Sequence, residues 1–325
     1  MAEQFNWGRC GVDLSVDTPR VRRGAGSAAA ATTIRRGPSR PIEGNMATGN
    51  PIRSSSMRGG VVPHSVHDAV DANGWTVRAA SRQGDTRQKT RRQDAYAVRH
   101  GGGRIAVVVC DGVGAAEHSH LAAAAASAAL AEHLLTADLE VSGDWTAHLK
   151  VASLAVTRAA GDLLGDRAPS LGAVYSVMAT TATALVVEPT DIGRGPWLAH
   201  TATVGDSSAW WRRTRGGALG FEPWLLMSGG RLTRHQIATS GALVLPLPDD
   251  AVVTGASFEI GHEELLLVCS DGVADAFDDG SSAVAASFAS GWSNPPRISD
   301  LADRIAFDAD RQVDDRTVVG VWTPR

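Results

Sequence analysis

The hydrophobic positions of this chain form short, nearly continuous runs separated by turn residues, together with a few longer Ala- and Leu-rich stretches. A short β-branched run that ends at Gly or Asp is typical of a buried strand, and a long stretch with apolar residues on one helical face is typical of a helix. This pattern predicts strands over 75–81, 94–99, 104–110, 180–188, 198–204, 209–213, 265–269 and 317–322. It predicts helices over 119–135, 144–164 and 298–310, with Ser299 as the N-cap of the third.

The order of these elements indicates the fold class. Neighbouring strands joined by short turns favour antiparallel sheets, and helices grouped between blocks of strands favour separate layers. The sequence therefore predicts an α+β protein.

The first part of the chain differs in composition from the rest. Residues 1–70 are rich in Arg, Gly, Ser, Ala and Pro and have no periodic apolar pattern, so we expect a disordered segment there and a folded domain over 71–325. Residues 1–60 contain nine Arg and four acidic residues. This segment is therefore either a basic interaction arm or a tail without a specific role.

Composition narrows the classes of partner. The formal net charge is −4, which gives no general reason to expect nucleic-acid binding. No apolar run approaches the roughly 20 residues that span a bilayer, and no signal peptide is recognisable, so we expect no membrane partner and a cytoplasmic location. Cys110 and Cys269 lie in apolar strands, where we expect buried free thiols.

Acidic residues stand where several predicted strands end. Asp111-Gly112 and Asp271-Gly272 each follow an apolar run, Asp206 follows another, and Asp314-Asp315 precede the last strand. Carboxylates brought together in this way repel one another unless a cation neutralises them. Their hard oxygen atoms suit Mg²⁺ or Mn²⁺.

These segments, together with Arg91-Arg92-Gln93-Asp94-Ala95, resemble in order and spacing the metal-dependent Ser/Thr protein phosphatases of the phosphatase 2C type, and most closely a bacterial branch. The resemblance extends from about Trp75 to Trp322. It implies a four-layer α-β-β-α sandwich of two antiparallel sheets flanked by helices. It also implies two Mn²⁺ or Mg²⁺ ions, with a position for a third.

The resemblance assigns roles to individual residues. Asp111 would bridge the two ions, the Gly112 carbonyl would bind one of them, and Asp271 and Asp315 would complete the other. Asp206 and Asp275 match positions for a third ion, and Asp94 matches an acidic residue that supports the centre through its water shell. The catalytic set is then Asp94, Asp111, Asp271 and Asp315.

The chain departs from the family pattern at several positions. Gln93 stands where a metal-binding Glu is common, and an amide brings no charge to an ion. Lys89 stands where many relatives place a phosphate-binding Arg, and Lys cannot make the bidentate contact. Arg87, Arg91 or Arg92 could take that role, and we name Lys89 and Arg91 as the candidate phosphate contacts. Arg316 stands where Asn is common.

The resemblance implies hydrolysis of phosphoserine and phosphothreonine on proteins, in opposition to a Ser/Thr kinase, by a water activated between two metal ions. The alternative is a catalytically silent phosphatase-like module that binds a phosphoprotein, and it rests on the departures at Gln93, Lys89 and Arg316. A third idea is that the Arg-rich arm binds acidic surfaces.

Overall fold

The computed structural model of the chain describes residues 65–72, 74–84, 91–139, 143–190, 196–212, 224–229, 243–307 and 314–325. All of them lie within one compact unit, Thr48–Arg325. The observations below concern these residues.

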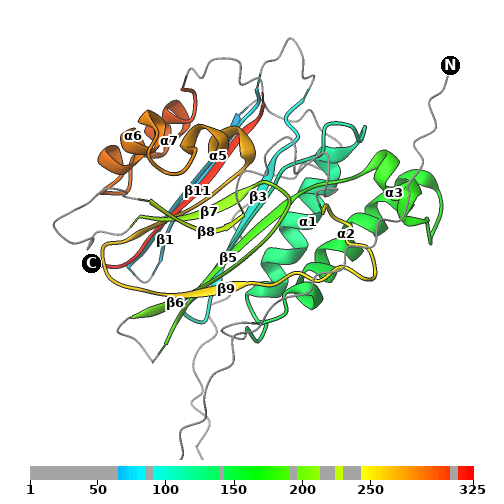
Figure 1. The fold of residues 1–325 in the computed structure, drawn as a ribbon, viewed down its shortest axis with the longest axis horizontal. Coiled ribbons are helices and arrows are strands. Elements are labelled where there is room, and N and C mark those ends of the chain that lie inside the picture. Colours follow the sequence, from blue (N-terminus) through cyan, green and yellow to red (C-terminus); the bar gives the residue numbers. More distant parts are fainter. Residues whose placement is uncertain are drawn as a thin grey trace, which may run out of the picture. The chain divides into compact units, whose positions relative to one another are not determined.

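Two antiparallel sheets form the centre of this unit (Figure 1). The six-stranded sheet has the order β1 (Ser65–Ala72), β2 (Trp75–Arg82), β11 (Arg316–Trp322), β10 (Leu265–Cys269), β7 (Ser208–Arg212) and β8 (Trp224–Gly229). The five-stranded sheet has the order β3 (Ala95–Gly101), β4 (Arg104–Cys110), β5 (Ala182–Pro189), β6 (Trp197–Val204) and β9 (Ala256–Ile260).

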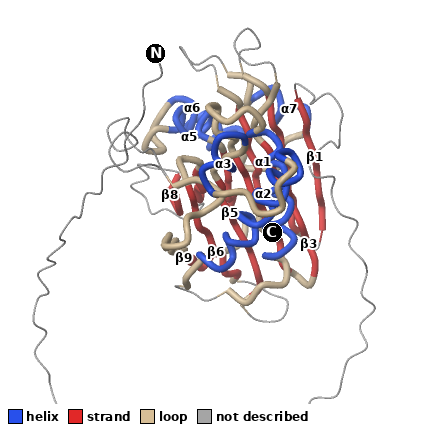
Figure 2. Tube along the Cα trace, turned by 90° about the vertical axis from the view of Figure 1, so that its right-hand side faces the viewer, coloured by secondary structure: helices blue, strands red, loops and turns tan. Residues whose placement is uncertain are grey.

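Helices cover the outer face of each sheet, as the two perpendicular views show (Figures 1 and 2). The helices α1 (Ser119–Leu134), α2 (Thr146–Leu164) and α3 (Leu171–Val177) pack on the five-stranded sheet. The helices α5 (Asp271–Phe277), α6 (Ala283–Gly291) and α7 (Ile298–Arg304) pack on the six-stranded sheet. The α-β-β-α sandwich expected from the sequence is therefore confirmed.

Three apolar cores separate the four layers, and they explain why the strands are apolar at consecutive positions. In β10, Leu266 and Val268 face the core between the sheets, whereas Leu265, Leu267 and Cys269 face the core beneath α5–α7. A strand that is covered on both faces buries every side chain, so its sequence has no polar alternation. Cys110 and Cys269 are buried free thiols, as predicted.

The structure differs from the sequence prediction in its shorter elements. The helix predicted over 298–310 has α7 only over Ile298–Arg304, and its N-cap is Arg297, so Ser299 lies inside the helix and the predicted N-cap is wrong. The sequence pattern did not predict β1, β8, β9, α3, α5 or α6. The predicted boundary at residue 70 falls within β1, while residues 1–64 lie outside the described residues.

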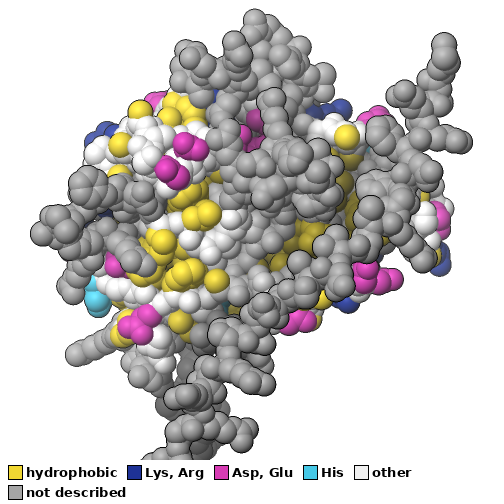
Figure 3. All heavy atoms as spheres, viewed as in Figure 1, with side chains coloured by type: hydrophobic (Ala, Val, Ile, Leu, Met, Phe, Trp, Pro, Cys, Tyr) yellow, Lys and Arg dark blue, Asp and Glu magenta, His cyan; other side chains and the backbone are white. Residues whose placement is uncertain are grey.

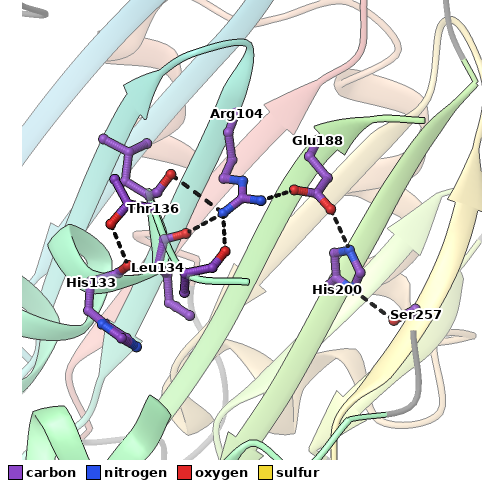
Figure 4. Close-up of polar contacts among 9 residues, drawn as sticks. Arg104, His133, Leu134, Thr136, Glu188, His200 and Ser257 are labelled. Carbon is purple, nitrogen blue, oxygen red and sulfur yellow. Dashed lines mark hydrogen bonds and ion pairs between the residues drawn. The ribbon is translucent and has the colours of Figure 1, made fainter. Parts of the chain in front are cut away.

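A polar network connects the end of α1 with neighbouring strands of the five-stranded sheet (Figure 4). The Arg104 guanidinium donates to the main-chain oxygens of Leu134 and Ala137 at the end of α1 and pairs with Glu188 on β5. Glu188 Oε1 lies 3.1 Å from His200 Nε2, and His200 Nδ1 lies 2.8 Å from Ser257 Oγ on β9. The network satisfies carbonyl groups at the end of α1 and joins this helix to the four strands β4, β5, β6 and β9.

No described helix has the length and apolar character needed to cross a membrane. Hydrophobic groups nevertheless reach the surface on the face drawn in Figure 3, among scattered acidic and basic side chains.

Candidate metal centre

Three carboxylates meet where strands of both sheets end. Asp111 follows β4, Asp206 lies in the turn between β6 and β7, and Asp271 follows β10 as the first residue of α5. One ligand oxygen from each residue lies within 4.8 Å of the others. Residues that are far apart in the sequence thus form one cluster of hard oxygen donors.

The backbone at Asp111 is held by two threonines on the approach to β5. Thr181 donates its amide to the Asp111 carbonyl at 2.8 Å, and the Asp111 amide donates to Thr181 Oγ1 at 3.0 Å. Thr180 Oγ1 also donates to the Asp111 carbonyl, at 2.7 Å. A Cβ on Gly112 would lie 2.9 Å from the Gln93 carbonyl oxygen, so only glycine fits next to this aspartate.

The turn that carries Asp206 is tied to the same segment. Gly205 has a φ of +95°, and a Cβ there would lie 2.5 Å from Thr181 Cγ2. Ser207 Oγ lies 3.0 Å from Thr181 Oγ1. Thr181 therefore fixes the positions of Asp111 and Asp206 together.

Asp271 is positioned by the start of α5. Ser270 is the N-cap of this helix, but its hydroxyl serves the site, because it donates to Asp94 Oδ2 at 2.7 Å. A Cβ on Gly272 would overlap the carbonyl oxygen of Asp315, so α5 packs directly against the backbone that precedes β11. Asp275 follows Asp271 by four residues within α5, which places both on one helix face.

Asp94 lies beneath the cluster and is 3% exposed. Its Oδ2 accepts hydrogen bonds from Ser270 Oγ and from Thr317 Oγ1, both at 2.7 Å. Its Oδ1 is buried without a hydrogen-bond partner among the described residues, as is Asp271 Oδ1. Two unsatisfied buried carboxylate oxygens at one place need a cation, a water or a proton.

Burial and mutual repulsion disfavour the charged forms of these acids. Burial raises the pKa of Asp111 well above its usual range, and the charges of Asp94 and Asp271 raise it further. Burial, then the charge of Asp314, raises the pKa of Asp271 to about 7. Burial also raises the pKa of Asp206, and the charges of Asp275 and Asp314 add to the effect. A divalent cation would relieve this repulsion.

The two acids before β11 have different surroundings. Asp315 is fully buried, and its two oxygens accept hydrogen bonds from the backbone amides of Gly84 and Gln93. Asp314 is partly exposed, and its charge raises the pKa of Asp111, Asp206 and Asp271. From the sequence, Asp315 was named as a metal ligand and Asp314 was given no role. The ligand role of Asp315 stays a prediction, because the group formed by Asp111, Asp206 and Asp271 includes neither member of this pair.

The candidate phosphate-binding residues that the structure describes have different surroundings. Arg92 is 1% exposed and donates to Ser81 Oγ and to the Asp94 carbonyl, so it supports the site from within the fold. Arg91 is exposed, and its guanidinium lies 3.1 Å from His120 Nε2. Burial, then the charge of Arg91, lowers the pKa of His120 to about 4. Arg87 and Lys89 lie outside the described residues.

Gln93 occupies the position where the resemblance leads one to expect a Glu. Its Nε2 donates to Ser119 Oγ at 2.7 Å, at the first residue of α1. The amide thus joins the segment before β3 to α1, next to Gly112. This hydrogen bond uses the side-chain nitrogen of Gln93. The side-chain oxygen is the atom that could bind a cation.

The cluster fits divalent cations by its chemistry. It offers oxygen donors alone, and its members repel one another as they stand. Asp271 Oδ1 in the cluster and Asp94 Oδ1 next to it have no hydrogen-bond partner within the described part of the chain. Oxygen donors without thiol or imidazole suit Mg²⁺ or Mn²⁺ better than Zn²⁺ or Cu²⁺.

Comparison with known proteins agrees with this geometry. Residues 83–221 match the family model described as Protein phosphatase 2C. A serine/threonine phosphatase of S. agalactiae aligns with a TM-score of 0.52 and 15% identity, over 80% of this chain and 99% of that one. PppA of Pseudomonas aeruginosa, described as a key regulatory component of T6SS, aligns with a TM-score of 0.52 and 18% identity, over 79% and 100%. The sequences of curated proteins give no match. At such identities the structural likeness establishes the fold.

Proposed function

We propose that this chain, which carries the sequence pattern and the fold of the protein phosphatase 2C family, is a metal-dependent phosphatase that hydrolyses phosphoserine and phosphothreonine on proteins. The observation that carries the proposal is the convergence of Asp111, Asp206 and Asp271, whose ligand oxygens lie within 4.8 Å of one another. Divalent ions held by such a carboxylate centre can activate a water for phosphomonoester hydrolysis without a covalent intermediate.

The proposal names the residues that would hold the ions. Asp111, Asp271 and the Gly112 carbonyl would hold the tightly bound ions, and Asp206 and Asp275 would serve an outer position. We assign Asp314 to this set and give Asp315 the role of fixing the backbone of Gly84 and Gln93. When bound, Mn²⁺ or Mg²⁺ would supply an activated water and neutralise the phosphoryl oxygens.

The chain's own groups would hold the reacting parts in place. Thr180 and Thr181 fix the backbone of Asp111. Asp94 accepts from Ser270 and Thr317 through one oxygen, and its other oxygen, which has no partner among the described residues, would hold a water of the metal shell. Arg91 is exposed, and it would contact the substrate phosphate.

The thiol next to the cluster is unsuited to act as a nucleophile. Cys110 is adjacent to Asp111, but it is fully buried, and burial raises its pKa above the usual thiol range. A buried neutral thiol is a poor nucleophile. Direct attack by water is the chemistry that this site supports.

The test is hydrolysis of p-nitrophenyl phosphate and of a phosphoserine peptide by the full chain with Mn²⁺, with Mg²⁺ and with EDTA. We expect turnover with either ion and none with EDTA, and we expect Asp271→Asn to abolish it. Full activity in EDTA would overturn the metal mechanism. Tight Mn²⁺ binding without any turnover would instead favour the silent phosphoprotein-binding module.

A further inference from the structure

A cavity lies at the end of the six-stranded sheet that is far from the carboxylate cluster. It has a volume of about 670 Å³ and is bounded by the start of β2, the end of β7, the start of β10 and the end of β11. Asp271 follows the other end of β10, and a strand rises about 3.3 Å per residue, so roughly 20 Å separate the two places. This cavity is therefore independent of the metal centre.

The walls of the cavity come from different layers. Thr76, Arg212 and Trp322 form the side of the sheet, and Ser293 and Asn294, between α6 and α7, form the opposite side. The Trp322 indole is held in place because its Nε1 donates to the Trp292 carbonyl at 2.9 Å. The result is a preformed space with an aromatic wall and several polar groups, within the size range of small-molecule sites.

Arg212 is the feature of the cavity that points to a ligand. Its Nε is buried without a hydrogen-bond partner, and within the described chain its guanidinium forms no ion pair. Burial lowers the pKa of this guanidinium, and no neighbouring acid offsets the effect. A partly buried cation without an acceptor is costly, and a carboxylate or phosphate would satisfy it.

The acids near the cavity do not take this role. Glu264 uses its Oε2 to accept from Trp211 Nε1 at 2.7 Å and from the Gly261 amide at 3.1 Å. Trp211 faces the core between the sheets, whereas Trp210 faces the core beneath α5–α7. Since side chains alternate along a strand, Arg212 lies on the same face as Trp210 and opposite to Trp211. Glu263 lines the cavity as well and limits the net positive charge there.

We propose that this cavity binds a small organic anion, with its carboxylate or phosphate group on Arg212 and its apolar part against Trp322. Guanidinium groups bind both kinds of oxyanion in a bidentate manner. Glu263 and Arg325 also line the space and offset each other in charge, so an anion with one oxyanion group matches the charge of Arg212.

The test uses the full chain after removal of metal by EDTA, so that the carboxylate cluster cannot bind anions through an ion. The probes are phenyl phosphate, benzoate and the neutral benzamide, titrated by calorimetry and followed through the ¹H–¹⁵N signal of the Arg212 Nε–H. We expect one of the two anions to bind and to shift that signal, and benzamide not to bind. The comparison of the two anions shows which oxyanion is preferred.

Two matched variants identify the site. Arg212→Gln keeps a polar side chain and removes the charge, and we expect it to weaken anion binding by about tenfold or more, as for loss of a charge-assisted pair. Arg158→Gln removes an exposed charge from α2 and should leave binding unchanged. Thermal unfolding shows whether Arg212→Gln is folded, and Arg212→Lys provides a second variant if it is not. Equal binding by wild type and Arg212→Gln, or no binding of either anion to the wild type, would overturn the proposal.

Discussion

At the scale of single residues, the site consists of acids that are held close together against their mutual repulsion. Thr181 holds Asp111 and lies against the turn of Asp206, while Ser270 joins Asp94 to the start of α5. The backbone and hydroxyl contacts therefore pre-form the cluster before any ion binds. This preorganisation reduces stability without metal and favours metal binding.

The first prediction concerns stability and pH without metal. Asp94 and Asp271 each have a folded-state pKa raised to about 7, mainly by burial, against about 4 in an unfolded chain. Their contribution to stability is complete below the unfolded pKa and is lost as pH rises through the folded pKa. In EDTA we therefore expect the melting temperature to fall between about pH 4 and pH 7 relative to an Asp271→Asn variant.

Melting curves at a series of pH values, with EDTA and with Mn²⁺, check this expectation. Added Mn²⁺ should raise the melting temperature most at the upper end of the series, because the ion binds the deprotonated carboxylates. An EDTA curve as flat for the wild type as for Asp271→Asn would contradict the raised pKa values.

The second prediction separates Asp314 from Asp315. Asp314→Asn should weaken Mn²⁺ binding and raise the melting temperature without metal, because it removes a charge that repels Asp271. Asp315→Asn should lower stability by about 1–2 kcal/mol, because Asn provides one acceptor oxygen for the two amides of Gly84 and Gln93.

Calorimetric titration with Mn²⁺ and thermal unfolding of the two variants decide between the residues. Loss of tight binding in Asp315→Asn, together with unchanged binding in Asp314→Asn, would return the ligand role to Asp315.

At the scale of elements, the site depends on how closely α5 approaches the backbone before β11. Gly272 is the second residue of the seven-residue helix α5, and the space for its Cβ is filled by the Asp315 carbonyl oxygen. Gly172 is the second residue of the seven-residue helix α3, and nothing lies within 4 Å of the place of its Cβ. The two glycines therefore form a natural pair for comparison.

The third prediction uses this pair. Gly272→Ala should destabilise the fold by about 1–3 kcal/mol or more and impair metal binding, since α5 must move away from Asp315. Gly172→Ala should be neutral or stabilising by up to about 1 kcal/mol, because alanine favours the helix. Denaturant unfolding and Mn²⁺ titration measure both effects, and similar results for the two variants would show that the approach of α5 is unimportant.

At the scale of the whole molecule, three apolar cores hold four layers together. The described members of these cores lie between Val66 and Trp322. The metal centre and the Arg212 cavity occupy opposite ends of one sheet, so strands of the six-stranded sheet reach from one to the other.

The fourth prediction follows from the extent of these cores. A chain without residues 1–60 should keep its turnover and its melting temperature nearly unchanged, because the described cores are complete without them. The comparison requires the same phosphatase assay and the same melting experiment on the full chain. A large loss of activity or of cooperative unfolding in the shortened chain would show that the N-terminal segment docks on the domain.

Much of this architecture was determined by local sequence. Continuous apolar runs such as 104–110 and 265–269 predicted β4 and β10 with their observed bounds, because a strand covered on both faces must be apolar throughout. The Asp-Gly pairs after those runs predicted acids at strand ends. Asp111 and Asp271 lie in one cluster because the ends of β4 and β10 come together in the fold.

Tertiary structure alone decided the rest. β1 and β9 lack a continuous apolar run, and their partners in the sheets stabilise them. Spacing could not show that Asp315 and Arg92 are buried while Asp314 and Arg91 are at least partly exposed, because the fold sets the direction of each side chain. The sequence also gave no sign that Arg212 lacks a partner, since the cavity forms where the segment between α6 and α7 lies against the strand ends of the six-stranded sheet.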